Sequence, residues 1–212
     1  MSEFTSTQQQ TESNQIYNLY KTPQSKAGLA TWNFVDWTHS KANAESMYNN
    51  NYVSSGLITG TQWDVILNTL KSKASLSDSD MTNSSSWGNY KNTAIDYKGR
   101  KATAYVSSGY WYLPVFGSTE TSTTTSYSDN YGDLLTTGAS STTEKYHIFD
   151  IAGNLWEWTE EDSHYATSGQ YRVLRGGSYI SASSGRPACY RACDPVSYTG
   201  LYIGFRVVLY IK

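Results

Sequence analysis

The clearest pattern in the chain is a helical repeat of apolar residues that begins just after residue 60. Positions spaced i, i+3, i+4 and i+7 carry large apolar side chains, namely Trp63, Ile66, Leu67 and Leu70. This spacing lines one face of an α-helix. Thr59 and Gln62 stand before it in the arrangement of a capping box. The pattern predicts a helix that starts after Thr59 and packs firmly against the core.

A weaker pattern predicts another helix earlier in the chain. Asp36 stands where a helix cap would be, and the helix would run to about Asn49. Ala42, Ala44 and Met47 would form a modest inward face. The Asn49–Asn51 run would end the helix.

Strand patterns are concentrated in the C-terminal quarter. A short apolar run, 172–175, leads into Gly176 and Gly177, and Val207–Ile211 is typical of a buried strand. Ile16–Tyr20 could form a further short strand. Between the two C-terminal runs, Ser178–Tyr202 follows neither a period of two nor one of 3.6. We therefore expect 178–202 to be a surface loop system on a rigid frame, which is where binding sites are common.

The middle of the chain breaks into short pieces and ends in a long Ser/Thr/Gly/Asp tract, Gly117–Thr143. Long irregular connections of this kind are usually functional or disordered. The opening residues 1–15 are polar and almost free of apolar side chains, so we expect a disordered lead-in. The rest, 16–212, has the length of one domain with a substantial core.

Composition narrows the classes of partner. Aromatic residues make up 15% of the 212 residues, charged residues only 16%, and the formal net charge is -2. Without a cluster of Lys and Arg to neutralise phosphates, nucleic acid is not expected as a partner. The polar opening matches neither a signal peptide nor a membrane span, so no membrane insertion is expected. The Tyr-, Ser-, Thr- and Asn-rich composition suits an extracellular or virion surface.

Five short phrases occur in a recognisable order: Leu57–Trp63, Trp87–Asn89, Gly153–Trp158, Arg175–Tyr179 and Gly204–Arg206. Their order resembles the formylglycine-generating-enzyme branch of the C-type lectin-like fold, over roughly Trp32–Ile211. The resemblance implies an α+β fold with two helices, a small antiparallel sheet and extensive irregular loops. Within the branch the chain most resembles the variable proteins of diversity-generating retroelements. The opening hairpin of such domains is not found, so the chain would be a compact variant or the C-terminal portion of a longer protein.

The resemblance also implies a function. In such variable proteins the segment from the Arg-Gly-Gly phrase to the Ile-Gly-Phe-Arg phrase is rewritten by mutagenic reverse transcription and binds a ligand. Here the segment is rich in Tyr, Ser and Gly, as binding loops often are. The expected partner is an external protein or cell-surface molecule, and the expected location is a bacterial cell surface or phage virion. The expected contact residues are Tyr179, Ser181, Ser183, Tyr190, Ala192, Asp194, Tyr198, Thr199, Leu201 and Tyr202.

Catalysis is not expected. The family's oxidation of substrate cysteines uses two active-site thiols that bind copper, and Cys189 matches the second of them. Where the first would fall, the chain has Ser181–Gly185 and no cysteine, and Cys193 lies on the wrong side of Cys189. The alternative is a pair of ordinary or mutually bonded thiols. The three histidines are isolated and show no metal-ligand spacing.

No cofactor is required by the expected binding function, but the resemblance implies a calcium site. It implies that the side chains of Asp150 and Glu157 and the carbonyls of Gly153 and Leu155 hold the ion, and these are the oxygen ligands that calcium needs. The alternative is that Asp150 caps a turn and Glu157 pairs with Arg175 or Arg206.

The remaining residues of the phrases are assigned to the frame. Glycine pairs permit positive φ or close backbone approach, and buried arginines can satisfy several loop carbonyls. We assign Arg175, Gly176, Gly177, Gly204 and Arg206 this role, and we expect Phe205 and Trp156 or Trp158 to be buried. Two other functions stay open, a cysteine oxidase and a structural surface domain without a ligand.

Overall fold

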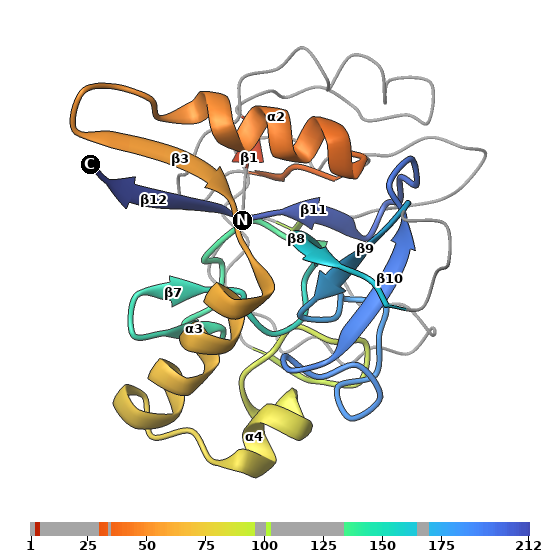
Figure 1. The fold of residues 1–212 in the computed structure, drawn as a ribbon. Coiled ribbons are helices and arrows are strands. Elements are labelled where there is room, and N and C mark those ends of the chain that lie inside the picture. The colour runs from red at the N-terminus through yellow and green to blue at the C-terminus, as the bar shows by residue number, and fades with distance from the viewer. Residues whose placement is uncertain (1–2, 5–29, 34, 96–100, 103–133, 165–169) are drawn as a thin grey trace.

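The computed structural model describes residues 3–4, 30–33, 35–95, 101–102, 134–164 and 170–212. Its helices are α2 (Trp37–Met47), α3 (Gly60–Lys73), the short α4 (Asp78–Thr82) and a 3-10 turn, η2 (Ser84–Ser86). Figure 1 shows α2 and α3 on different sides of a small curled sheet. The α+β class predicted from the sequence is confirmed.

Helix α3 forms as its pattern predicts. The amide of Gln62 donates to Thr59 Oγ1 at 3.1 Å, and the Gln62 side chain accepts from the Thr59 amide at 2.9 Å, which completes the capping box. Trp63, Leu67 and Leu70 are buried, and Ile66 is half-buried beside them. The capping box fixes where the helix begins, and the apolar face determines which side of the helix packs against the core.

Helix α2 also begins where the sequence predicts, because Asp36 accepts the amide of His39 at 2.8 Å. Its inward face differs from the prediction. Ser40 and Ala44 are buried, whereas Ala42 is exposed. A hydrogen bond explains this orientation. Ser55 Oγ, from the strand formed by residues 53–57, donates to the Ala44 carbonyl at 2.6 Å, so the helix presents Ser40 and Ala44 to that strand.

A four-stranded sheet organises the C-terminal half. Its strands are β8 (Trp156–Asp162), β9 (Tyr171–Arg175), β10 (Arg191–Pro195) and β11 (Ile203–Phe205), in the order β10-β9-β8-β11. Strand β9 is antiparallel to both of its neighbours, but β11 is parallel to β8. The expected antiparallel sheet is therefore a mixed one, because the chain returns after β10 and enters β11 in the direction of β8.

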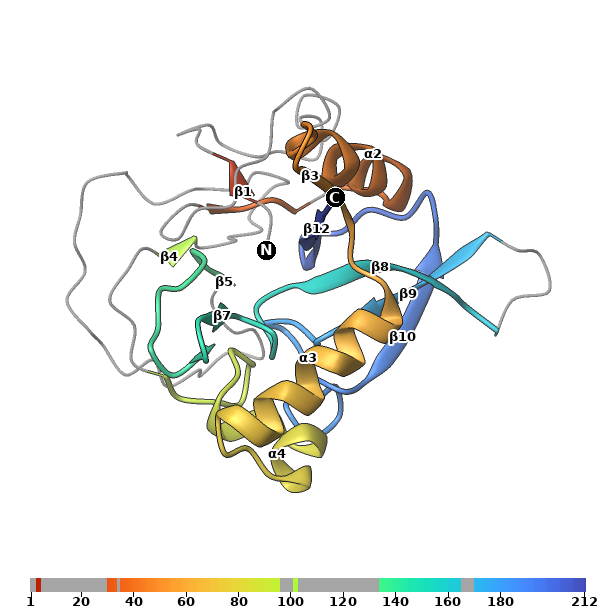
Figure 2. The same cartoon turned by 60° about the vertical axis from the view of Figure 1, so that its left-hand side comes forward.

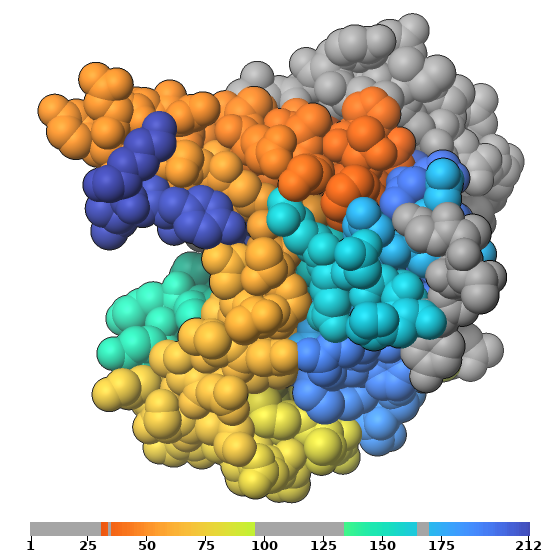
Figure 3. Space-filling view, in the orientation of Figure 1, coloured from red at the N-terminus to blue at the C-terminus, as the bar shows by residue number. Residues whose placement is uncertain are grey.

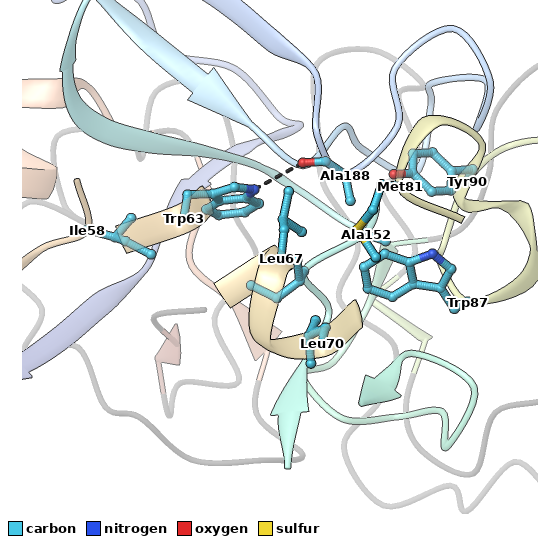
Figure 4. Close-up of a cluster of buried hydrophobic side chains, with 10 residues drawn as sticks. Ile58, Trp63, Leu67, Leu70, Met81, Trp87, Tyr90, Ala152 and Ala188 are labelled. Carbon is cyan, nitrogen blue, oxygen red and sulfur yellow. Dashed lines mark hydrogen bonds between the residues drawn. The ribbon is translucent and has the colours of Figure 1, made fainter. Parts of the chain in front are cut away.

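The two faces of this sheet carry separate cores. On one face, a first core cluster contains Trp32, Val35, Ala44, Leu57, Trp156, Trp158, Leu174, Ile203 and Phe205. A second core cluster joins α3 to the region around Trp87 and Tyr90, and Trp63 Nε1 there donates to the Ala188 carbonyl at 3.0 Å (Figure 4). Alternation along the strands produces this division, since Trp158 and Leu174 point to the first cluster and Arg175 points to α3.

The last strand, β12 (Val207–Ile211), pairs antiparallel with β3 (Val53–Leu57) in a separate two-stranded ribbon. The strand was predicted, but its burial was not as predicted. Leu209 is 58% exposed and Ile211 is 92% exposed. Figure 3 shows the dark blue end of the chain projecting from the body, so β12 has apolar sequence without a core on both sides.

Three further strand pairs are short. They are β1 (Glu3–Phe4) with β2 (Ala30–Thr31), β4 (Lys101–Ala102) with β5 (Leu134–Leu135), and β6 (Glu144–Lys145) with β7 (Ile148–Phe149), and Figure 2 shows β4, β5 and β7 on the side of the sheet away from β10. Strand β1 falls within the predicted lead-in 1–15. The predicted strand Ile16–Tyr20 and most of the tract 117–143 lie outside the described residues. None of the described helices has the length and apolar character that crossing a membrane requires.

Candidate functional site

Arg175 is the centre of the C-terminal frame. Its side chain is fully buried, and Nη1 donates to the carbonyls of Cys189 at 2.5 Å and Tyr190 at 3.1 Å. Nη2 pairs with Asp64 of α3 at 2.5 Å. Burial, with the positive charge of Arg191 nearby, lowers the pKa of Arg175 to about 10, which leaves the guanidinium charged at neutral pH. The predicted role of Arg175, a buried donor to loop carbonyls, is confirmed.

The glycines of the frame are required by geometry. Gly176 and Gly177 have φ of +92° and +76°. A Cβ on Gly177 would lie 2.2 Å from the Arg186 carbonyl oxygen, and one on Gly204 would lie 2.5 Å from that of Trp32. Side chains at these positions would separate segments that must touch, so the predicted scaffold role of the three glycines is confirmed.

Beside this frame, five of the predicted contact residues lie together. Tyr190, Ala192, Tyr198 and Tyr202 are half-buried and pack on the rim of the first core cluster. The rings of Tyr190 and Trp156 meet edge to face, with centroids 6.1 Å apart, and the hydroxyls of Tyr198 and Tyr202 are 2.6 Å apart. Asp194 shares the strand face of Ala192 and interacts electrostatically with Tyr202. We call Tyr190, Ala192, Asp194, Tyr198 and Tyr202 the binding face.

The binding face is less exposed than an open loop would be. Burial raises the pKa of the Asp194 carboxyl above its ordinary value. Burial and the hydrogen bond with Tyr198 raise the pKa of Tyr202. Three other predicted contact residues, Ser181, Thr199 and Leu201, are also half-buried. All eight keep part of their surface available to a ligand.

Two predicted contact residues are wrong. Tyr179 is only 2% exposed and packs with Leu134 and Leu155 in a small core cluster. Ser183 is 1% exposed, and its amide donates to Asn92 Oδ1 at 2.8 Å. Tyr179 lies two positions after Gly177, and its amide donates to the Asn154 carbonyl at 3.0 Å. Both residues support the frame rather than meet a ligand.

The segment Ser178–Tyr202 is also not the loop system that its sequence predicts. It contains β10, which pairs over five positions with β9, from Arg191 opposite Arg175 to Pro195 opposite Tyr171. A strand with one buried and one exposed face shows a hydrophobic period of two. Side chains on both faces of β10 are instead partly buried. Polar and apolar residues therefore do not alternate along it, and the pattern stays hidden.

The carboxylates predicted to bind calcium are buried and engaged by protein donors. Asp150 accepts the Thr143 hydroxyl at 2.6 Å and the Gly138 amide at 2.9 Å. Glu157 accepts Arg206 through both oxygens, each at 2.8 Å. Arg206 also donates to the Phe149 carbonyl at 2.9 Å. The alternative reading, with Asp150 in a turn and Glu157 paired to Arg206, describes these contacts.

The two carboxylates predicted to bind calcium point at different protein donors. Glu157 directs both oxygens at Arg206, and Asp150, at φ +53°, directs its own at the turn formed by 138–143. Gly153 and Leu155, the predicted carbonyl ligands, are buried. The four residues are better described as the buried support of the sheet.

The thiols of Cys189 and Cys193 are both free and half-buried. Cys193 lies on β10 opposite Val173, whereas the Cys189 side chain packs against the second core cluster. The positions where a second active-site thiol would fall, Ser181–Gly185, form a turn in which Gly185 donates its amide to the Ala182 carbonyl at 3.1 Å. These residues supply no sulfur to pair with Cys189.

A groove of about 480 Å³ lies next to the binding face. Residues from β8, β9, β10 and their connections line it: Glu161, Asp162, Ser163, His164, Val173, Arg186, Tyr190, Arg191, Ala192 and Cys193. Sequence reasoning found Tyr190 and Ala192 but missed the others. Glu161 and Arg186 line the same groove, and no sequence motif connects them.

Comparison with known proteins places the chain. Residues 81–211, more than half of it, match the sulfatase-modifying factor enzyme 1-like domain. A mouse (Mus musculus) protein named inactive C-alpha-formylglycine-generating enzyme 2 is 40% identical over 58 residues, 27% of this chain and 18% of that protein. The solved structure of Treponema denticola variable protein 1 aligns at 18% identity with a TM-score of 0.39, over 75% of this chain and 49% of that one.

The chain thus spans less than half the length of either relative. The family match covers four of the five phrases in full and all of the four-stranded sheet. With two helices packed about a curled mixed sheet, the architecture is the α+β, C-type lectin-like one expected from those phrases. The chain belongs to the family of sulfatase-modifying factor enzyme 1-like domains.

Proposed function

We propose that this protein is a ligand-binding module whose binding face is diversified by a retroelement. One observation carries the proposal: four of the five residues of the binding face pack on the rim of one core, with Asp194 beside Tyr202, and other residues hold the backbone there. Arg175 and the frame glycines fix the backbone beneath Tyr190 without using its side chain. Side chains on this face are therefore free to change while the fold is kept.

The chemistry of the face supports recognition. Tyrosines offer large contact area at small entropic cost, and Tyr190, Tyr198 and Tyr202 supply three of them at half burial. Asp194 adds a carboxylate that can interact with polar or positively charged groups of a ligand. The partner is an external protein or cell-surface molecule, and display would be at a bacterial cell surface or on a phage virion.

Random libraries test the tolerance of the face. Positions 190, 192, 194, 198 and 202 are randomised together and displayed, and a matched library randomises four exposed positions on α3, Thr61, Val65, Asn68 and Ser72. Both libraries should remain largely protease-resistant. Binders to a test protein such as lysozyme should come mainly from the first library. Equal yields, or unfolding of the first library, would contradict the proposal.

A genetic observation tests diversification separately. The locus should hold a second, near-identical copy of the DNA that encodes the variable segment, close to a reverse transcriptase gene. Mismatches between the copies should fall at adenines of the template. A locus without such a copy would leave a binding module that is not diversified.

A further inference from the structure

The groove beside β10 has a distinctive balance of charge. Glu161 pairs with Arg191 at 3.0 Å, and Asp162 pairs with Arg172 at 2.5 Å. Both carboxylates in the wall are therefore already neutralised by arginines of the protein. Arg186, in contrast, has no carboxylate within ion-pair distance among the described residues, and its Nη1 donates to the neighbouring Gly185 carbonyl at 2.9 Å.

The guanidinium of Arg186 is nevertheless held in place. Its Cζ lies 4.5 Å from the centroid of the Tyr190 ring. Stacking on an aromatic ring restrains a guanidinium and leaves its edge free to donate, and that edge matches the two oxygens of a carboxylate. Arg186 and Tyr190 both line the groove, so a cation that has no ion-pair partner in the described part of the chain belongs to its wall.

We propose that the groove binds a carboxylate side chain of an acidic peptide segment, with Arg186 as its anchor. A volume of about 480 Å³ suits a side chain with part of its backbone. Val173 and Ala192 offer apolar contact to the aliphatic part of a glutamate. This inference rests on the proposed function and deepens it, because Tyr190 and Ala192 belong both to the groove and to the binding face.

The groove is lined partly by the binding face, whose side chains could change, and partly by residues outside it. Figure 3 shows the cyan end of β8 directly beside the blue region of β10 on one face. Changes at 190 and 192 would reshape the groove, whereas Arg186 and the Arg191–Glu161 pair lie outside the binding face. Variants that keep an aromatic ring at position 190 would then share a requirement for an acidic group in the ligand.

Matched peptides test the anchor. Fluorescein-labelled oligoglutamate and oligoglutamine peptides of equal length are titrated with the protein at low salt, and binding is followed by fluorescence anisotropy. The glutamate peptide should bind more tightly. Arg186→Gln should weaken its binding by about tenfold, the usual effect of losing one charge-assisted contact. Arg186→Lys, which keeps the charge but not the fork geometry, should lie between the two.

Lys71→Gln is the matched control, because it removes one positive charge from α3, where Lys71 pairs with Asp78. It should leave binding unchanged. Since Arg186 is exposed, all three variants should melt close to the wild type. Equal binding of the two peptides, or equal losses in Arg186→Gln and Lys71→Gln, would overturn the proposal.

The two proposals fail differently. If the library at the binding face yields binders but the glutamate peptide does not depend on Arg186, the groove assignment is wrong and the module remains. If the library yields none while the peptide still requires Arg186, the groove is a fixed site and the diversified function is wrong.

Discussion

Arg175 holds the backbone of Tyr190, since its Nη1 donates to the Tyr190 carbonyl oxygen at 3.1 Å. The two residues are 15 positions apart, and the contact does not involve the tyrosine ring. A backbone fixed in this way does not depend on which side chain position 190 carries. The same guanidinium ties the strand to α3 through Asp64, so one residue joins three parts of the fold.

Replacing Arg175 should therefore damage the fold more than replacing any exposed arginine. Arg175→Gln would leave two carbonyls without a donor and Asp64 without its buried partner. We expect a loss of roughly 3 kcal/mol in the free energy of unfolding, measured by urea denaturation. Arg186→Gln, at an exposed position, should cost at most about 0.5 kcal/mol. Similar losses in both variants would contradict the assigned role.

The tyrosines of the variable segment should fall into two classes. Tyr179→Ser empties a buried site and should cost about 3 to 5 kcal/mol. Tyr198→Ser removes a half-buried ring at the rim of the core and should cost about 1 kcal/mol. Thermal unfolding of the single variants checks the order. If Tyr198→Ser were the more damaging, residue 198 would belong to the frame.

Stability should depend on pH through Asp194. Burial raises its folded-state pKa above the ordinary value of 3.8, so the ionised carboxylate disfavours the folded state. This contribution is absent at low pH and appears as the pH rises through the folded-state pKa. Asp194→Asn should match the wild type in Tm near pH 3, exceed it by a margin that grows from about pH 3.8 to the folded-state pKa, and keep a constant margin above that pH. A Tm difference that does not change with pH would contradict this account.

Metal removal should have no effect on the fold. The carboxylates of Asp150 and Glu157 are occupied by Thr143, Gly138 and Arg206, so chelation by EDTA should leave the Tm unchanged. Glu157→Gln, by contrast, breaks a buried ion pair and should cost roughly 3 kcal/mol. A Tm that falls with EDTA and recovers with added calcium would restore the metal site, because a ligand bound only by the native state stabilises it.

Catalysis should also be absent. Cys189 has no second cysteine within Ser181–Gly185, where the family's chemistry would require one. Incubation with a cysteine-containing sulfatase-type peptide, with and without copper, should leave the peptide mass unchanged. Conversion of the peptide thiol to an aldehyde, seen by mass spectrometry, would show that one thiol is sufficient.

Most of the correct predictions rested on short-range patterns in the sequence. The capping box and the apolar spacing of α3 act within a few residues, as does the cap of α2 at Asp36, and all three were predicted correctly. The burial of Arg175 and Phe205 and the positive φ of Gly176 and Gly177 followed from the phrases that contain them. Of the predicted contact residues, eight keep accessible surface.

The errors arose where distant segments decide the outcome. Strand β10 has no clean alternation, because Arg191 reaches Asp64 and Glu161 on one side while Ala192 meets the core on the other. Val207–Ile211 has the sequence of a buried strand, yet its position in a two-stranded ribbon leaves Ile211 in solvent. Burial of Tyr179 depends on Leu134, 45 positions earlier, and sequence spacing carries no sign of that contact.

The place of β10 at the end of the strand order affects how the protein could evolve. Within the described sheet its neighbour is β9, so a new side chain at 192 or 194 meets one strand rather than two. A change on β10 would need no matching change in a second neighbouring strand. A change on β9, in contrast, would have to be accommodated by two neighbouring strands. Mutations along β10 could therefore accumulate independently of one another, and lineages could explore many surfaces without passing through unfolded intermediates.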